Sequence, residues 1–83
     1  MNKFLVLVYV PLLEKEYNIY IPINKKIGTI KNVIINSITE LSELSSDKLS
    51  NLKLYDKETS NIYNSDSLVK ESCIINGTKL LLM

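Results

Sequence analysis

The first segment of the chain constrains its folding most, because residues 4–10 are apolar at every position. A Lys followed by an apolar run also opens a secretory signal, but such a signal ends in small residues of the Ala-x-Ala kind. This sequence contains no Ala, and its first Gly is Gly28. The run is also far shorter than the roughly 20 residues of a membrane-spanning helix. Its β-branched and aromatic residues suit a strand, so we expect a buried β-strand and a cytoplasmic protein.

The composition points to one domain over residues 1–83. An apolar content of 46% argues against disorder. The single Cys excludes an internal disulfide framework and fits a reducing compartment. A net charge of +1 provides no long-range field for nucleic acid or anionic lipid. We therefore expect neither nucleic-acid binding nor direct membrane insertion.

The second apolar segment has the two-residue period of a half-buried strand. Tyr17, Ile19 and Ile21 alternate with Asn18 and Tyr20. A proline and a charged cluster lie between this segment and the first, which predicts an antiparallel hairpin. Pro22 cannot donate to a sheet ladder and is predicted to lie at a strand end.

The period then changes to that of a helix. Thr29 directly precedes the periodic run and is the predicted N-cap. Asn32, Asn36 and Glu40 lie on the polar side, and the pattern breaks within residues 42–47, where the helix should end. The apolar residues follow the i, i+3, i+4 spacing of one helical face: Ile30, Val33, Ile34, Ile38 and Leu41.

Short strands are predicted in the second half of the chain. Leu52 and Leu54 alternate with polar neighbours, which indicates a third strand, and residues 62–63 indicate a short return strand. Residues 79–83 indicate a last strand after an Asn-Gly turn, a pair that tolerates positive φ. A hairpin followed by a crossing helix is an α+β plan, in which the first and last strands lie side by side and parallel.

This order of elements resembles the ubiquitin-like β-grasp, an α+β fold with a mixed sheet of four to five strands and one helix packed across one face. Residues 29–34, Thr-Ile-Lys-Asn-Val-Ile, resemble the start of the ubiquitin helix. The closing segment 72–83 and the second strand are similar to the YukD-like (EsaB-like) family of small bacterial ubiquitin-fold proteins. The sequence departs from that family by the extra residues 23–28, Ile-Asn-Lys-Lys-Ile-Gly, before the helix.

Resemblance to this family implies an accessory role in type VII protein secretion, in which a cytoplasmic protein binds components of the secretion apparatus. Ubiquitin-fold modifiers and sulfur carriers instead need a flexible tail that ends in Gly-Gly. The present sequence ends in Lys-Leu-Leu-Leu-Met. A modifier or carrier role is therefore the least favoured alternative, and the fold alone does not decide function.

No enzyme activity, cofactor or metal site is expected from the residue types. Without His the chain lacks an ordinary nucleophile–base pair, and its acids lack metal-loop spacing. Cys73, beside Ile74 and Ile75, is predicted to be a small packed hydrophobe rather than a redox thiol. Lys25 and Lys26 would lie near the N–H groups of the helix start, where an anion can bind. A solvated loop with ordinary surface lysines is the favoured interpretation of that pair.

The feature with most bearing on function is that the first and last predicted strands are apolar on both faces. One helix covers one face of a sheet, so each strand should be apolar on one side. One set is expected to face the helix: Phe4, Val6, Val8, Val10, Leu80 and Leu82. The other set would form a continuous patch on the open face: Leu5, Leu7, Tyr9, Leu81 and Met83. Such a patch reaches the size at which an interface is implied.

Lys53 and Tyr55 alternate onto the same outer face, where they would form a polar-aromatic rim. Tyr55 fits equally well as an ordinary sheet aromatic, and packed loops on both faces are the alternative explanation of the patch. The sequence thus favours a non-enzymatic module that binds a protein partner, or a second copy of itself, through the open face. The alternative is an edge strand that pairs with a partner strand or with itself.

Overall fold

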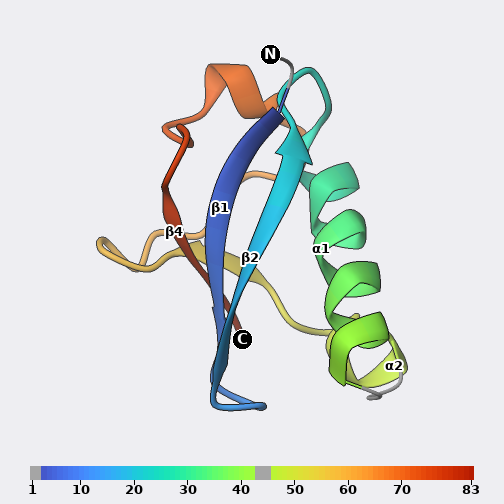
Figure 1. Ribbon diagram of the computed structural model, residues 1–83. Helices are drawn as coiled ribbons and strands as arrows, with labels where there is room; N and C mark the ends of the chain where they lie inside the picture. Colours follow the sequence, from blue (N-terminus) through green and yellow to red (C-terminus); the bar gives the residue numbers. More distant parts are fainter. Residues whose placement is uncertain (1–2, 43–45) are drawn as a thin grey trace.

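The computed structural model describes residues 3–42 and 46–83. Positions 43–45, within the predicted end of the helix, lie outside the described residues. The elements follow one another along the chain (Figure 1) as β1 (Lys3–Val10), β2 (Lys15–Pro22), α1 (Ile27–Ser42), α2 (Ser46–Leu49), β3 (Leu54–Asp56), the 3-10 turn η1 (Val69–Glu71) and β4 (Lys79–Leu82).

The strands form one mixed sheet in the order β2-β1-β4-β3. β1 pairs antiparallel with β2 and parallel with β4, and β4 pairs antiparallel with β3. α1 crosses one face of this sheet (Figure 1). The predicted first strand, the hairpin, the parallel first and last strands and the position of Pro22 at the end of β2 are therefore confirmed.

The core lies between the sheet and α1. The residues predicted to face the helix do so: the three valines of β1 and both inward leucines of β4 have no exposed surface, and Phe4 packs against them while partly buried. This separation follows from the period-2 geometry of a strand, which sends alternate side chains to opposite faces. The other set of β1 and β4 residues therefore points away from α1.

α1 begins at Ile27, so the prediction that Thr29 is the N-cap is wrong. The backbone N–H of Ile27 donates to the carbonyl of Ser67 at 2.8 Å, and that of Gly28 donates to the carbonyl of Ser65 at 2.9 Å. The first N–H groups of a helix lack partners inside the helix. A distant loop supplies those partners here, so the helix starts two residues before the local capping signal.

The predicted inner face of α1 is confirmed for Ile30, Ile34 and Ile38, which are buried. The prediction that Leu41 belongs to this inner face is wrong, because its side chain is 67% exposed. It lies on the correct stripe, but the buried residues of α1 end at Ile38, and Leu41 stands in the last turn beyond them. Ile35, which is not part of the predicted stripe, is buried as well.

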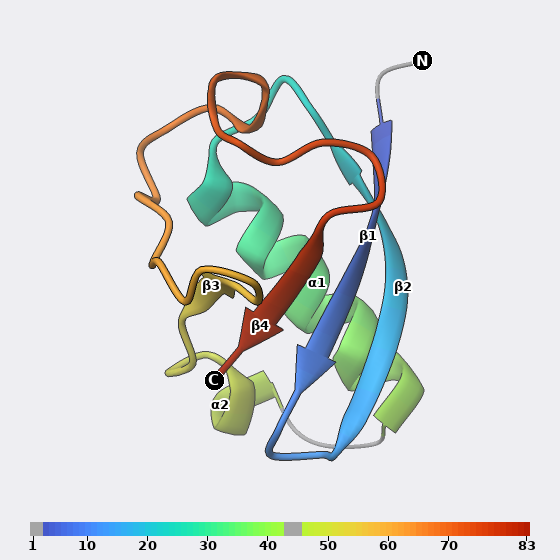
Figure 2. The ribbon, with the colours of Figure 1, turned by 90° about the vertical axis from the view of Figure 1, so that its left-hand side faces the viewer.

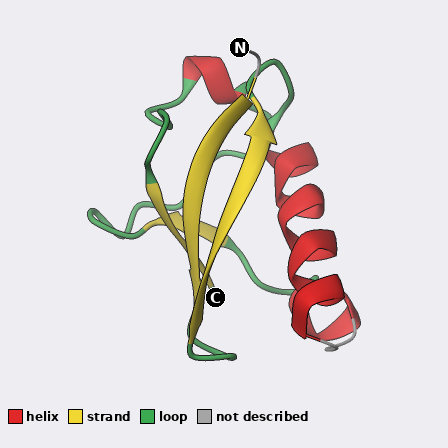
Figure 3. Ribbon diagram, viewed as in Figure 1, coloured by secondary structure: helices red, strands yellow, loops and turns green. Residues whose placement is uncertain are grey.

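The second half of the chain contains less strand than predicted. The third strand is limited to Leu54–Asp56, and Leu52 packs against the core before it. The predicted return strand at residues 62–63 is reduced to one bridge between Tyr55 and Ile62. Figure 3 shows the long loop between β3 and β4, interrupted by η1. That loop is held by individual backbone hydrogen bonds, such as the one from Asp56 N–H to the Asn61 carbonyl at 2.9 Å.

Candidate protein-binding surface

The sheet face opposite α1 carries the predicted patch, and Figure 2 looks onto it with α1 behind the sheet. The strand register places Tyr9 beside Leu81 and Leu81 beside Tyr55. Neighbouring residues in register point to the same face, so these three side chains form a row across β1, β4 and β3. Leu7 lies two positions before Tyr9 in β1 and extends the row. We call Leu7, Tyr9, Tyr55 and Leu81 the outer row.

The remaining predicted patch residues lie at opposite ends of this face. Leu5 stands beside Tyr20 of β2. Met83 follows β4 and exchanges two backbone hydrogen bonds with Lys53, at 2.9 and 3.0 Å. Met83 is 50% exposed, whereas Leu5 and the outer row are half-buried. The face of β1 and β4 opposite α1 is thus only partly covered by other residues.

The side chain of Lys57 covers part of the outer row. Its Nζ lies 4.9 Å from the centroid of the Tyr9 ring and 3.8 Å from the Glu16 carboxylate. Lys57 follows β3 and Tyr9 belongs to β1, so the lysine side chain crosses the intervening β4. An exposed cation–π contact contributes about 0.5–1 kcal/mol and a surface ion pair about 0–1 kcal/mol. The lysine can therefore swing off the outer row at small cost.

This face also carries residues that were not predicted for it. Tyr20 is 60% exposed beside Leu5, and the alternation within β2 was sufficient to find it. Lys57 and Lys79 stand next to the outer row, and the backbone N–H of Lys57 donates to the Lys79 carbonyl at 3.2 Å. Opposite them on β2 is Glu16, so the lysines give the face a positive balance. Lys53 is exposed and also lines a cavity on the helix side of β3.

The anion-site hypothesis for Lys25 and Lys26 loses its structural basis. Both lysines are exposed, and the N–H groups at the helix start already donate to backbone carbonyls. The carbonyl of Lys25 accepts the N–H of Val69 at 2.9 Å, which ties the extra loop residues to η1. The favoured interpretation, a surface loop with ordinary lysines, agrees with this geometry.

The prediction that Cys73 is a packed hydrophobe is wrong, because its side chain is exposed. Ile74 is 2% exposed and occupies the core position of this segment. Its neighbours Cys73 and Ile75 therefore point outward. Three consecutive small or apolar residues do not reveal from sequence which one faces inward.

Tyr63 is the single described residue whose buried side-chain oxygen makes no hydrogen bond. Burial raises the pKa of Tyr63 to about 12, and the nearby Asp56 carboxylate adds to this shift through its negative charge. No hydrogen bond of standard geometry joins the two groups. Asp56 instead accepts the backbone N–H of Glu58 at 2.9 Å. This hydroxyl lies on the loop side of the molecule, away from the outer row.

Within residues 3–42 and 46–83, no group of three or more His, Cys, Asp or Glu side chains is placed to hold a metal ion. No helix in the same part of the chain has the length and apolar character needed to cross a bilayer.

Comparison with solved structures assigns the fold: the chain has the ubiquitin-like β-grasp fold, with a mixed four-stranded sheet and one helix packed across it. The ubiquitin-like domain of the Mycobacterium tuberculosis type VII secretion system protein ECCD1 superposes with a TM-score of 0.70 at 14% identity, over 99% of this chain and 98% of that one. Ubiquitin from Caldiarchaeum subterraneum superposes with a TM-score of 0.67 at 11% identity, over 96% and 90% of the two chains.

A chain of the MycP5-free ESX-5 inner membrane complex superposes with a TM-score of 0.79 at 9% identity. All of the present chain is matched, but it spans 21% of that chain. No family model and no curated protein matches the sequence. At these identities the likeness is one of fold.

Proposed function

We propose that this protein is a non-enzymatic, cytoplasmic ubiquitin-like module that binds a protein partner through the outer row, as an accessory component of a type VII secretion system. The observation that carries the proposal is the row of Tyr9, Leu81 and Tyr55 across three strands on the face without a helix. Aromatic and aliphatic side chains at the centre of a patch are the usual anchors of an interface.

The chemistry of this face also describes the partner. Lys57 and Lys79 border the outer row, and Glu16 is already engaged by Lys57. Charges at the edge of an interface select partners and raise the association rate. A complementary surface would present apolar side chains bordered by carboxylates. Displacing Lys57 from Tyr9 would free one aromatic face for that partner, at the small cost of one exposed cation–π contact and one surface ion pair.

Assignment to secretion rests on the sequence resemblance to the YukD-like family and on the fold of the ECCD1 domain. A small ubiquitin-like chain and a ubiquitin-like domain of a secretion protein share a scaffold on which a docking face can be varied. Because a fold hosts many functions, the docking face itself has to be tested.

Site-specific photo-crosslinking in host cells tests the proposal. A crosslinking residue at Tyr20, beside the patch, should yield an adduct with a component of the secretion apparatus, whereas one at Asn36 on the exposed side of α1 should not. Adding Leu7→Ser and Leu81→Ser should abolish the Tyr20 adduct. Leu41→Ser, at an exposed leucine remote from the outer row, is the matched control and should leave it intact.

Circular dichroism establishes that the double variant remains folded. If a folded double variant keeps both its adduct and its oligomeric state, the outer row is not the interface. If the adduct persists but contains an unrelated protein, the surface stands and the assignment to secretion fails.

A second candidate function is pairing through the edge strand β2. This strand has eight residues and ends the sheet, whereas β3 at the other edge has three. An unpaired edge strand can recruit a partner strand or a second copy. Sedimentation of the purified chain distinguishes the two interfaces, because Leu7→Ser with Leu81→Ser should dissociate an assembly formed through the outer row and leave a β2–β2 dimer intact.

A modifier or sulfur-carrier role remains the least favoured alternative. Such a role requires a flexible segment that a partner enzyme can reach, whereas residue Met83 is held by two backbone hydrogen bonds to Lys53. A covalent adduct at the carboxylate of the chain would reverse this ranking.

A further inference from the structure

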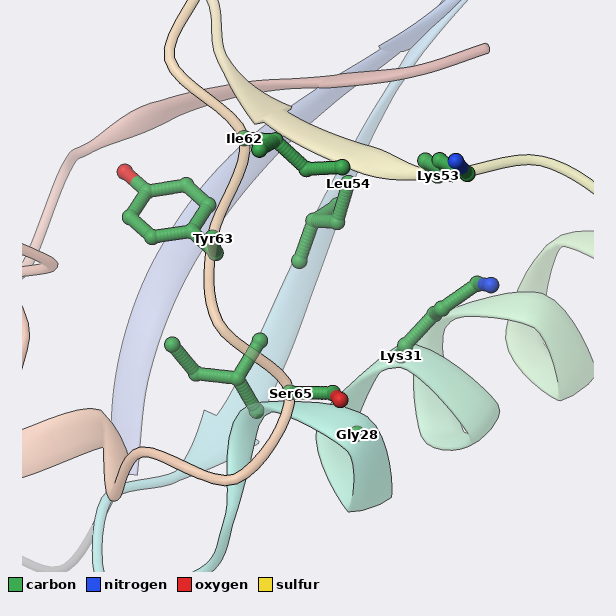
Figure 4. A pocket seen from close by; sticks show the side chains of 8 residues that line it. Gly28, Lys31, Lys53, Leu54, Ile62, Tyr63 and Ser65 are labelled. Carbon is green, nitrogen blue, oxygen red and sulfur yellow. The ribbon is translucent and has the colours of Figure 1, made fainter.

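A second surface feature lies on the other side of the sheet, between α1 and β3. It is a cavity of about 250 Å³ lined by residues from α1, from β3 and from the loop that follows β3: Ile27, Gly28, Lys31, Lys53, Leu54, Ile62, Tyr63 and Ser65. Figure 4 shows the aliphatic side chains of Leu54 and Ile62 on one side of the cavity and Lys31 and Lys53 on the side away from Tyr63.

Part of the wall of this cavity belongs to the hydrophobic core. Ile27 and Leu54 are 3% and 4% exposed, so they belong to the core. Ile62 is 55% exposed, which is unusual for an isoleucine whose backbone pairs with β3. Small-molecule sites typically occupy roughly 300–1,000 Å³. A smaller cavity of this kind suits one large side chain of a peptide.

The residues that line the cavity give its rim a positive charge. The lining contains two lysines and no Asp or Glu. Lys31 makes a long hydrogen bond, 3.5 Å, to the carbonyl of Ser50. Lys53 forms no ion pair with any residue of the described part of the chain. The N–H groups of Ile27 and Gly28 are occupied by loop carbonyls, so a ligand carboxylate would meet the lysines rather than the helix backbone.

We propose that this cavity binds a short acidic peptide segment by one aromatic or large aliphatic side chain, with adjacent carboxylates paired to Lys31 and Lys53. The side chain would cover the exposed surface of Ile62 and rest on Leu54. Charge-assisted contacts to the two lysines would fix the direction of the peptide. This site is separate from the outer row, because none of its lining residues belongs to that row.

The test uses the full chain and a synthetic probe, an acetylated pentapeptide with Phe between two pairs of Glu. Amide chemical-shift changes measured by NMR should concentrate at Lys31, Leu54, Ile62 and Ser65, with saturable binding in the millimolar range or tighter. Replacing the Phe of the probe by Ala, or its Glu residues by Lys, should abolish the shifts.

Protein variants separate this site from general attraction to lysines. Lys31→Glu combined with Lys53→Glu should weaken the probe at least tenfold, and Ile62→Ser should weaken it severalfold while the chain stays folded. Lys70→Glu, which reverses an exposed lysine of η1 that lines neither the cavity nor the outer row, is the matched control and should change affinity less than twofold. Equal loss with Lys70→Glu, shifts confined to Leu7 and Leu81, or absence of saturable binding would each overturn the proposal.

Discussion

The backbone N–H of Leu5 donates to Oδ1 of Asn76 at 2.7 Å, across 71 positions of sequence. The N–H of the next residue, Gly77, donates to the carbonyl of Leu5, also at 2.7 Å. The turn before β4 therefore forms hydrogen bonds with both the N–H and the carbonyl of Leu5 in β1. Two positions further on, Leu7 stands in register with Lys79. These two hydrogen bonds fix the parallel register that brings Tyr9 beside Leu81.

Replacing Asn76 by Ala should destabilise the protein by about 1 kcal/mol, because the N–H of Leu5 loses its acceptor. Asn76→Asp keeps a carboxylate oxygen in the same place and should cost less. Urea unfolding followed by circular dichroism measures both. Equal stability of the Ala variant and the wild type would show that solvent replaces the bond without loss.

Gly77 should be the more sensitive residue of the same turn. Its φ is 91°, a conformation that side chains with a Cβ disfavour. An added Cβ would meet no atom within 4 Å, so the cost is conformational and not steric. We expect Gly77→Ala to lose about 1 kcal/mol or more and Gly77→Asn to lose less, since Asn tolerates positive φ. A neutral Ala variant in urea unfolding would contradict the strain argument.

Gly28 should be intolerant of large side chains for a steric reason. A Cβ there would lie 3.3 Å from both Cβ and the carbonyl oxygen of Ser65. Because the N–H of Gly28 binds that same carbonyl at 2.9 Å, the loop cannot retreat without losing the bond. Gly→Ala within a helix normally gains about 1 kcal/mol.

We therefore expect Gly28→Ala to show no such gain and Gly28→Val to lose about 1–3 kcal/mol through overpacking. Asn36→Ala, at an exposed position of the same helix, should show the ordinary gain of a few tenths of a kcal/mol. Thermal unfolding of the three variants gives the comparison. A full helix-propensity gain from Gly28→Ala would mean that the loop yields freely.

Tyr63→Phe should stabilise the protein at pH 7 by up to about 1 kcal/mol, because it removes a buried hydroxyl without a hydrogen bond. Unfolded tyrosine ionises near pH 10, while the pKa of Tyr63 in the folded protein is about 12. The unfolded state thus releases its proton first, and stability falls as pH rises from 10 to 12.

The Phe variant should lack this part of the alkaline loss, so its advantage over the wild type should grow across that interval. Tyr20→Phe, at a tyrosine that is 60% exposed, is the matched control and should track the wild type. Urea unfolding at neutral and alkaline pH measures the difference. An advantage that stays constant with pH would contradict the burial of this hydroxyl.

The strands and helix were predictable where the local pattern repeats. The two-residue period of β1, β2 and β4 divides their side chains into two sets, and Val6, Val8 and Leu80 of the predicted inward set are buried as expected. The helical spacing of Ile30, Ile34 and Ile38 determined the covered face of α1. These features depend on the fixed periods of strand and helix, which a short stretch of sequence carries by itself.

The candidate surface was predictable in its residues but not in its contacts. Alternation placed Tyr9 and Leu81 outward, yet the reach of Lys57 across β4 to the Tyr9 ring depends on the pairing of β3 with β4. The apolar and basic cavity beside Ile62 likewise joins segments that are far apart along the chain.

What the sequence alone determined is therefore the periodic part of the fold: a central strand that is apolar on both sides, a hairpin and one amphipathic helix. Only the tertiary structure decided where the helix starts, because Ser65 and Ser67 supply its first acceptors in place of Thr29. It also decided that Cys73 and Leu41 point outward. The physical reason is that a periodic pattern depends only on residues close together in sequence. The hydrogen-bond acceptors at a helix start, and the contacts that bury or expose a side chain, come from residues brought together by folding.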